Sequence, residues 1–272
     1  MKSRDAIASQ LEDAGCVAAE EEADELVEAA REDEGLLEAL VARRVAGEPL
    51  AWVTGSVIFL GCRVRVHPGV YVPRWQTEGL TLRAIELTPA GGLAADLCTG
   101  SGAIAVALGR ARPAARVVAG ELDPVAWRCA KENGVEVYAG HLDEPLPEEL
   151  KGRFDVVIAV VPYVPSEEFA YLPRDVRDYE PHLALDGGPG GTRVLAQAVW
   201  AGARLLHSGG ALLLELGGSQ DEALDSVLGA AGFVAARRYR DDDGDLRGIE
   251  ATFGAARPGQ TATATYLGGW SP

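Results

Sequence analysis

The 272-residue sequence is long enough to bury a full hydrophobic core, either as one large domain or as one large and one small domain. Apolar residues make up 47% of the chain, which suits a globular α/β protein and excludes wholesale disorder. The formal net charge of -16 opposes binding to phosphate backbones, and no stripe of Arg and Lys offsets it, so we exclude direct nucleic-acid binding.

Helical periodicity begins near the N-terminus, where apolar residues such as Leu26, Val27 and Ala30 recur at spacings of three and four. We expect two or three amphipathic helices, in an N-terminal helical domain over residues 1–54 that binds a partner or substrate. Residues 1–46 hold thirteen Asp or Glu against five Lys or Arg. This acidic face either meets a basic partner or is an ordinary solvated surface.

The period changes to alternation in residues 55–75, which predicts a β-hairpin linker between two domains. From residue 76 to residue 256, helical segments alternate with apolar strand segments. This order predicts a Rossmann-like α/β domain with a mostly parallel seven-stranded sheet covered on both faces. We expect the last two strands to be antiparallel around the turn DDDGD, and residues 257–272 to form a loose C-terminal tail.

The cysteines and the hydropathy exclude other classes of protein. No CxxC pair occurs, and no His stands at ligand spacing beside any of the four cysteines, so we expect no metal site. The first fifteen residues lack the apolar core of a signal peptide, and no stretch approaches the roughly 18 apolar residues of a membrane span. We therefore expect a cytoplasmic protein with no membrane partner.

A glycine turn follows the first strand of the α/β domain. Asp96 ends that strand, Gly100 and Gly102 follow it into a helix, and Glu121 ends the next strand, where it can accept hydrogen bonds from ribose hydroxyls. This pattern fits NAD as well as S-adenosylmethionine, and it also fits a tight structural turn. Asp96 favours S-adenosylmethionine, because a carboxylate there can orient the cofactor's ammonium group and would repel a pyrophosphate.

The fourth strand ends in VVPYVP (160–165), at the edge of the sheet where open α/β proteins bind ligands. A rigid turn with a packed aromatic ring would explain the same residues. If the site binds S-adenosylmethionine, a methyl donor, Tyr163 is a candidate for packing against the group that accepts the methyl.

Several motifs together resemble the HemK/PrmC family of protein-(glutamine-N5) methyltransferases. They occur in the family's order over about 250 residues and include GEPLAWVTG (47–55), PRWQTE (73–78), DLCTGSGAIA (96–105), FDVVIAVVPYVP (154–165) and LLLELGGSQ (212–220). The resemblance implies an S-adenosylmethionine-dependent N-methyltransferase that modifies a glutamine side chain in a protein such as a peptide chain release factor. It implies a cofactor site formed by Asp96, Thr99, Gly100, Gly102, Glu121, Leu122, His141 and Leu142.

On the acceptor side, the resemblance implies catalytic roles for Val160, Pro162 and Tyr163, and substrate contacts from these residues with Val161 and Arg74. It also places Glu180 near the site, although Glu180 could equally cap a helix or hold a loop.

The chain departs from the family at two places. Val160 and Val161 replace the first two residues of the family's NPPY motif, and His141 stands where the family has Asp in a GDL segment. The side chain of Val160 cannot accept the hydrogens of an amide, which can cost about 3 kcal/mol of transition-state stabilisation. Three alternatives therefore stay open: a diverged enzyme acting on a small molecule, a weak or inactive cofactor-binding homologue, and, at the level of the fold, an NAD-dependent oxidoreductase.

Overall fold

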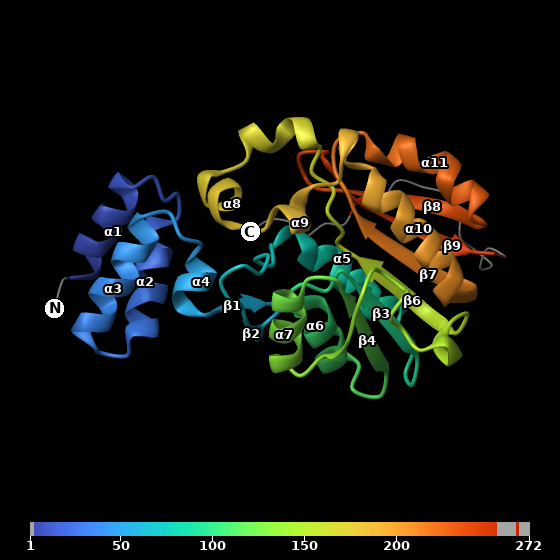
Figure 1. The fold of residues 1–272 in the computed structure, drawn as a ribbon, viewed down its shortest axis with the longest axis horizontal. Coiled ribbons are helices and arrows are strands. Elements are labelled where there is room, and N and C mark those ends of the chain that lie inside the picture. The colour runs from blue at the N-terminus through green and yellow to red at the C-terminus, as the bar shows by residue number, and fades with distance from the viewer. Residues whose placement is uncertain (1–2, 255–264, 267–272) are drawn as a thin grey trace.

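The N-terminal part of the chain is helical. A computed structural model describes residues 3–254 and 265–266 (Figure 1). The first helices are α1 (Arg4–Asp13), α2 (Ala19–Ala30), α3 (Glu34–Val45) and the short α4 (Leu50–Thr54). Their apolar faces form one cluster around Ile7, Leu11 and Leu26, so the predicted amphipathic helices are confirmed.

A hairpin follows the helices. Strands β1 (Ser56–Phe59) and β2 (Cys62–Arg65) pair antiparallel. Leu60 and Gly61 form the two-residue turn, and both have positive φ, as a type I′ turn requires. The hairpin is confirmed but is shorter than the alternation in the sequence, which continues to Val72. Residues 66–75 contain no strand, and their valines pack around Trp52 instead.

The large sheet begins after α5 (Gln76–Leu87). Its strands, in chain order, are β3 (Leu93–Leu97), β4 (Arg116–Glu121), β5 (Glu136–Ala139), β6 (Phe154–Ala159), β7 (Leu206–Glu215), β8 (Phe233–Arg240), β9 (Leu246–Phe253) and β10 (Thr265–Tyr266). Their spatial order is β10-β8-β9-β7-β6-β3-β4-β5. Strands β3 to β7 run parallel, and β9 is antiparallel to β7 and β8. The predicted sheet of seven strands is confirmed, with β10 added at its edge.

Helices cover both faces of this sheet (Figure 1). On one face, α5 and α6 (Ala103–Ala111) pack against Val156 and Ile158 of β6, and α7 (Pro124–Glu132) covers β4. On the other face, α10 (Arg193–Leu205) and α11 (Gln220–Ala230) pack against Val157 and Ala159 of the same strand. Successive residues of β6 therefore serve opposite faces, which explains why the strand is apolar from Val156 to Ala159.

Residues 163–192 carry short elements that the sequence periodicity did not predict. These are η2 (Ser166–Tyr171), α8 (Arg174–Tyr179), α9 (His182–Leu185) and η3 (Pro189–Gly191). Tyr179 donates a hydrogen bond from its hydroxyl to the carbonyl of Ala46, at 3.0 Å, and so ties α8 to the end of α3. This segment therefore bridges the helical part of the chain and the α/β part.

The C-terminal tail differs from the prediction in one respect. Thr265–Tyr266 forms β10, which pairs parallel with β8, so the expectation of a loose tail over residues 257–272 is wrong for these two residues. The other residues of that tail lie outside the described part of the chain. None of the helices within residues 3–254 is long and apolar enough to cross a membrane.

Element types change near the predicted domain boundaries. Helix α4 ends at Thr54, and α5 begins at Gln76 after the hairpin and the extended segment that follows it. We propose on this basis that residues 1–54 form the helical domain, 55–75 the linker and 76–256 the α/β domain, with 257–272 as the tail.

Candidate functional site

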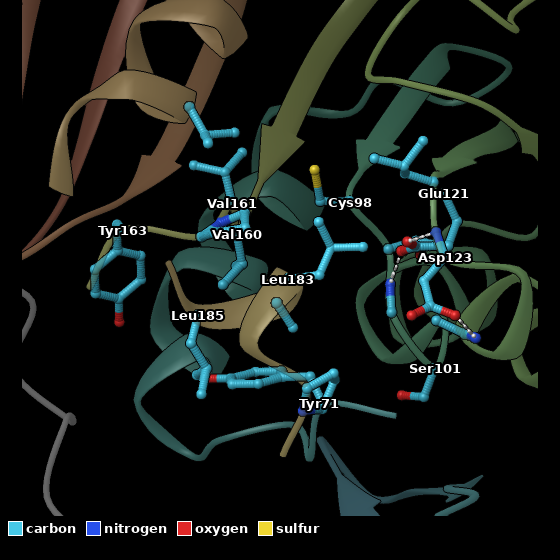
Figure 2. A pocket seen from close by; sticks show the side chains of 18 of the residues that line it. Tyr71, Cys98, Ser101, Glu121, Asp123, Val160, Val161, Tyr163, Leu183 and Leu185 are labelled. Carbon is cyan, nitrogen blue, oxygen red and sulfur yellow. Dashed lines mark hydrogen bonds between the residues drawn. The ribbon is translucent and has the colours of Figure 1, made fainter. Parts of the chain in front are cut away.

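A cavity of about 460 Å³ opens where the carboxyl ends of β3, β4 and β6 meet. Strand order reverses between β3 and β6, because β4 and β5 extend to one side and β7 to the other, and ligands bind at such switch points in open α/β sheets. Figure 2 shows the acidic residues Glu121 and Asp123 on one side of this cavity and Val160, Val161 and Tyr163 on the other.

The glycine loop joins β3 to α6 along one wall. Gly102 has φ +88°, and a Cβ placed on it would lie 2.7 Å from Val135 Cγ2 and 3.4 Å from the backbone of Ala130. Only glycine fits this position without strain, since both the backbone conformation and the packing exclude a side chain. The loop therefore turns sharply, and Thr99, Gly100 and Ser101 line the cavity.

Asp96 lies behind this wall. Its carboxylate is 1% exposed, and Oδ2 accepts hydrogen bonds from Thr99 Oγ1 at 2.5 Å and from Ala105 N at 3.2 Å. Burial raises the pKa of Asp96 to about 7, against the two hydrogen bonds, which lower it. Oδ1 has no hydrogen-bond partner among the described residues. Asp96 does not line the cavity, whereas Thr99 does. The Thr99 hydroxyl donates its hydrogen to Asp96, and its oxygen can still accept a hydrogen bond from the cavity side.

Glu121 lines the cavity from the end of β4. Its carboxylate accepts backbone hydrogen bonds from Gly100 N at 2.7 Å and Asp123 N at 2.8 Å, which hold it against the glycine loop. Burial raises the pKa of Glu121, and these backbone bonds oppose the rise. A carboxylate offers about four acceptor sites, so capacity remains for the hydroxyls of a ribose.

The remaining predicted cofactor residues, Leu122, His141 and Leu142, are divided between the cavity and the core. His141 and Leu122 line the cavity, whereas Leu142 is 3% exposed and packs in the core of the sheet. Asp143 is buried in a bidentate ion pair with Arg204, with N–O distances of 2.6 and 2.7 Å. Asp143 is thus engaged away from the cavity, and His141 is the polar side chain of residues 141–143 that lines it.

The acceptor side is largely apolar. All four residues of the VVPY segment, 160–163, line the cavity, and Leu183 and Leu185 of α9 also contribute to its wall. Val160 lies partly buried against the core under α5 and α6, and its side chain has no polar atom. The hydroxyl of Tyr163 donates to Glu215 Oε1 at 2.8 Å. The predicted acceptor residues therefore come together, apart from Arg74.

Arg74 does not line the cavity, although the sequence predicted a substrate contact for it. Its guanidinium forms an ion pair with Glu180 and lies 5.1 Å from the ring centroid of Tyr71, which does line the cavity. Burial raises the pKa of Glu180, and Arg74 opposes that rise. We propose that Arg74 and Glu180 act on the acceptor only through Tyr71 and the backbone of Val72, whose amide donates to Glu180 at 3.4 Å.

Some residues of the site were not predicted from the sequence. Cys98 lines the cavity with φ +57°, a conformation that costs an L-residue about 1 kcal/mol, and burial raises the pKa of its thiol. Glu215, at the end of β7, and Gln220, at the start of α11, contact Tyr163. In the sequence, the only indication of a role for Glu215 and Gln220 is that they lie in LLLELGGSQ. Their contact with Tyr163 could not be predicted, because Tyr163 is distant along the chain.

The glycine loop and its surroundings fit S-adenosylmethionine. The buried oxygens Asp96 Oδ1 and Ser101 Oγ lack partners among the described residues, and Ser101 lies in the cavity wall. The hydroxyl oxygens of Thr99 and Ser101, in the cavity wall, suit an ammonium group, and Glu121 suits ribose hydroxyls. The carboxylates of Glu121 and of the nearby Asp96 would repel a pyrophosphate. Fold and site define a class I S-adenosylmethionine-dependent methyltransferase.

Comparison with known proteins confirms this class of enzyme and identifies the family within it. No protein-family model matches the chain. The chain is 36% identical over 221 residues to a release factor glutamine methyltransferase of Geobacter sulfurreducens, covering 79% of this chain and 77% of that protein. It is also 36% identical over 203 residues to a 4-amino-L-phenylalanine/4-methylamino-L-phenylalanine methyltransferase of Streptomyces pristinaespiralis, covering 71% and 69%. The chain belongs to the release factor glutamine methyltransferase (HemK/PrmC) family.

Comparison with solved structures supports the fold and carries no argument about function. A methyltransferase from Pyrococcus furiosus superposes with a TM-score of 0.54 at 17% identity, covering 72% of this chain and 90% of that one. The predicted cofactor, S-adenosylmethionine, follows from the family, and the oxidoreductase alternative is wrong.

Proposed function

We propose that this enzyme transfers a methyl group to the side-chain nitrogen N5 of a glutamine in a peptide chain release factor. The observation that carries the proposal is the 36% identity to a release factor glutamine methyltransferase over more than three quarters of both chains. The cavity supports it, because cofactor residues and acceptor residues face each other across one space. S-adenosylmethionine supplies the electrophilic methyl group when bound.

The residues of the chain hold and orient the two reactants. Glu121 and the glycine loop hold the cofactor side, and the VVPY segment forms the wall against which the glutamine lies. An in-line approach at near contact distance is the main requirement of the transfer. With the cofactor bound, the amide nitrogen would form a bond to the methyl carbon while the methyl–sulfur bond breaks and leaves a neutral thioether. The nitrogen would then release one proton to water. The wall residues Leu183 and Leu185 exclude water from the apolar part of the site.

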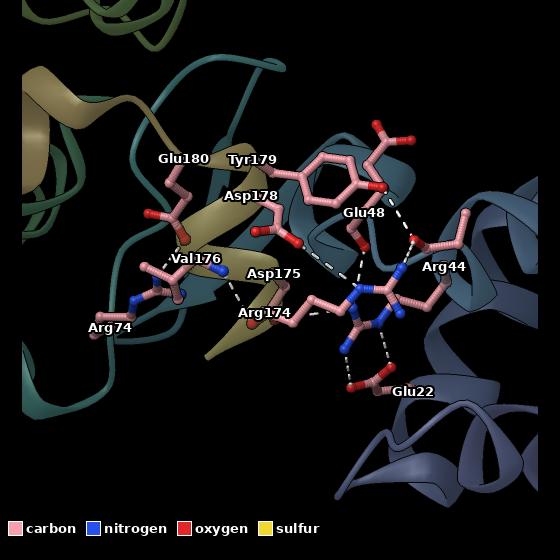
Figure 3. A network of polar contacts seen from close by, with 11 residues as sticks. Glu22, Arg44, Glu48, Arg74, Arg174, Asp175, Val176, Asp178, Tyr179 and Glu180 are labelled. Atoms are coloured by element: carbon pink, nitrogen blue, oxygen red, sulfur yellow. Dashed lines mark hydrogen bonds and ion pairs between the residues drawn. The ribbon is translucent and has the colours of Figure 1, made fainter. Parts of the chain in front are cut away.

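A protein acceptor also needs a docking surface, and we propose the helical domain together with α8. Figure 3 shows how they are joined: Arg44 of α3 pairs with Glu22 of α2 at 2.6 Å and with Asp175 of α8 at 3.8 Å. Arg174 donates to the carbonyl of Ala46 at 3.2 Å. Helix α8 leads into residues 181–186 of the cavity wall, so a protein bound to the acidic helical domain would lie beside the site.

The decisive experiment compares the natural chain with Val160→Asn and Val160→Ala on a purified release factor, with the methylated residue located by mass spectrometry. Asn restores a side-chain acceptor for the amide hydrogens, so kcat/KM for the glutamine should rise about 10²-fold. Val160→Ala only enlarges the space and should not raise it. Absence of methyl transfer to the release factor by all three proteins would contradict the proposal.

A second candidate is methylation of a small aromatic amine. The apolar wall formed by Val160, Val161 and Leu183 favours it, as does the similarity to the Streptomyces pristinaespiralis enzyme. In this case the natural chain would methylate 4-amino-L-phenylalanine, and Val160→Asn would reduce that rate. The same set of proteins therefore separates the two acceptors.

A further inference from the structure

Two buried polar side chains, one at the end of β7 and one at the start of α11, bind the hydroxyl and the carbonyl of Tyr163. The Tyr163 hydroxyl donates to Glu215 Oε1 at 2.8 Å. The carbonyl of Tyr163 accepts a hydrogen bond from Gln220 Nε2 at 2.7 Å. Glu215 is 4% exposed and Gln220 is 7% exposed, so water competes little for either contact.

Each of these side chains also binds a second segment of the cavity wall. Glu215 Oε2 accepts a hydrogen bond from Thr77 Oγ1 at 2.6 Å, and Thr77 lines the cavity. Gln220 Nε2 also donates to the carbonyl of Gly190 at 3.3 Å, and its Oε1 accepts from Gly217 N at 3.0 Å. One carboxylate therefore joins the PRWQTE segment to the VVPY segment, and one amide joins the VVPY segment to η3.

Gly191 packs closely against the carbonyl of Tyr163. A Cβ on Gly191 would lie 2.0 Å from the Tyr163 carbonyl oxygen and 2.3 Å from Gln220 Nε2. The chain therefore approaches this carbonyl through a glycine, and the carbonyl is fixed by the approach as well as by the hydrogen bond. A displacement of about 1 Å at a substrate-positioning group can reduce a rate 10²-fold, so such a fixed wall has a direct use in methyl transfer.

We propose that Glu215 and Gln220 are positioning residues for methyl transfer, which fix the acceptor wall by holding Tyr163 at its hydroxyl and at its carbonyl. The inference rests on the proposed placement of the acceptor beside the VVPY segment. Neither residue touches the reacting atoms. Glu215 acts as a hydrogen-bond acceptor for two hydroxyls, and no proton of the reaction passes to it.

The test compares Glu215→Leu, Glu215→Gln and Gln220→Ala with the natural chain. Glu215→Leu and Gln220→Ala should lower kcat 10- to 100-fold and leave the Kd for S-adenosylmethionine within about twofold. Glu215→Gln should restore most of the activity, because the hydroxyls of Tyr163 and Thr77 can either donate to an amide or accept from it. Equal losses for Gln and Leu would mean that the charge of Glu215 is needed, and would overturn the proposal.

Tyr239→Phe is the matched control, because Tyr239 donates its hydroxyl to Glu250 in another buried Tyr–Glu pair that does not line the cavity. It should leave kcat and KM unchanged even where it lowers the melting temperature. In the Glu215→Leu background, Tyr163→Phe should change kcat less than about twofold, since the bond that it removes is already absent. Additive losses would show that the two residues act separately and would contradict the proposal.

Amide hydrogen exchange tests the inference without any acceptor. Gln220→Ala should accelerate exchange at Val164 and Gly191, whose amides are bonded in this segment, while Tyr239→Phe should not. Unchanged exchange in Gln220→Ala would overturn the positioning role. If the natural chain fails to methylate a release factor while exchange still accelerates, the proposed acceptor is wrong and the positioning role stands.

Discussion

The buried carboxylate of Asp96 should make cofactor binding depend on pH. Burial raises the pKa of Asp96 to about 7 in the protein without ligand. A cation bound near Thr99 favours the ionised carboxylate and so lowers that pKa. By linkage, binding of S-adenosylmethionine releases a proton from Asp96, and the affinity must rise as pH increases toward and through 7.

The magnitude follows from the fraction of Asp96 that is already ionised. With a pKa of about 7, about 9% of Asp96 is ionised at about pH 6 and about 76% at about pH 7.5. The Kd should therefore be about eightfold lower at the higher pH, which corresponds to about 1.2 kcal/mol. An α-amino group with a pKa of about 7.8 is about one third neutral at about pH 7.5, which offsets a small part of this gain.

Calorimetric titration with S-adenosylmethionine across this range measures the effect directly. Asp96→Asn removes the titrating group and should give a Kd that is nearly independent of pH. Glu121→Gln should weaken binding through the ribose. Because the charge of Glu121 contributes to the raised pKa of Asp96, this variant should also move the rise in affinity to lower pH. A flat profile for the natural chain, or an unchanged slope in Asp96→Asn, would refute the coupling between Asp96 and the cofactor.

Two further predictions concern stability and can be measured by urea unfolding. Gly100→Ala should lower the free energy of unfolding by about 1 kcal/mol, because of the φ of +59° alone. Gly102→Ala should lower it by about 2 to 3 kcal/mol, because the added Cβ also meets Val135. Equal losses in the two variants would contradict this reasoning. Arg204→Ala should lower the free energy of unfolding by about 2 kcal/mol, because it leaves the buried carboxylate of Asp143 unpaired. Adding Asp143→Asn should recover part of that stability. No recovery in the double variant would show that Arg204 stabilises the fold by packing instead.

The elements of the large sheet could be predicted because their signals are local. Residues 93–97 and 154–159 are short runs, each apolar except for one Asp, and segments with helical periodicity lie between them. Chain order alone therefore implied a parallel sheet. Residues 163–192 carry no such period. Their short helices are held by distant partners, as when Glu180 binds Arg74 and Tyr179 binds the carbonyl of Ala46. Tertiary contacts of this kind leave no periodic trace in a sequence.

The same distinction applies to the site. The glycine loop and Glu121 could be predicted, because a tight turn and the acid that follows it lie within one strand–helix–strand unit. Glu215 and Gln220 lie 52 and 57 residues from Tyr163, and only the fold brings them together. Sequence order placed LLLELGGSQ within the family but could not show which residue it contacts.

The contacts of the VVPY segment explain why Val160 can differ from the family's Asn while Tyr163 is kept. The hydroxyl of Tyr163 is bonded to the buried carboxylate of Glu215, so loss of this side chain would leave Glu215 Oε1 without its donor. Gln220 bonds the backbone carbonyl, which any residue at position 163 would keep. Val160 makes only apolar contacts in the fold, and its side chain faces the cavity. A substitution at position 160 therefore alters what the acceptor meets without disturbing the wall that holds it. Chemistry at this site can diverge at position 160 at little cost to stability, whereas position 163 is constrained by folding as well as by methyl transfer.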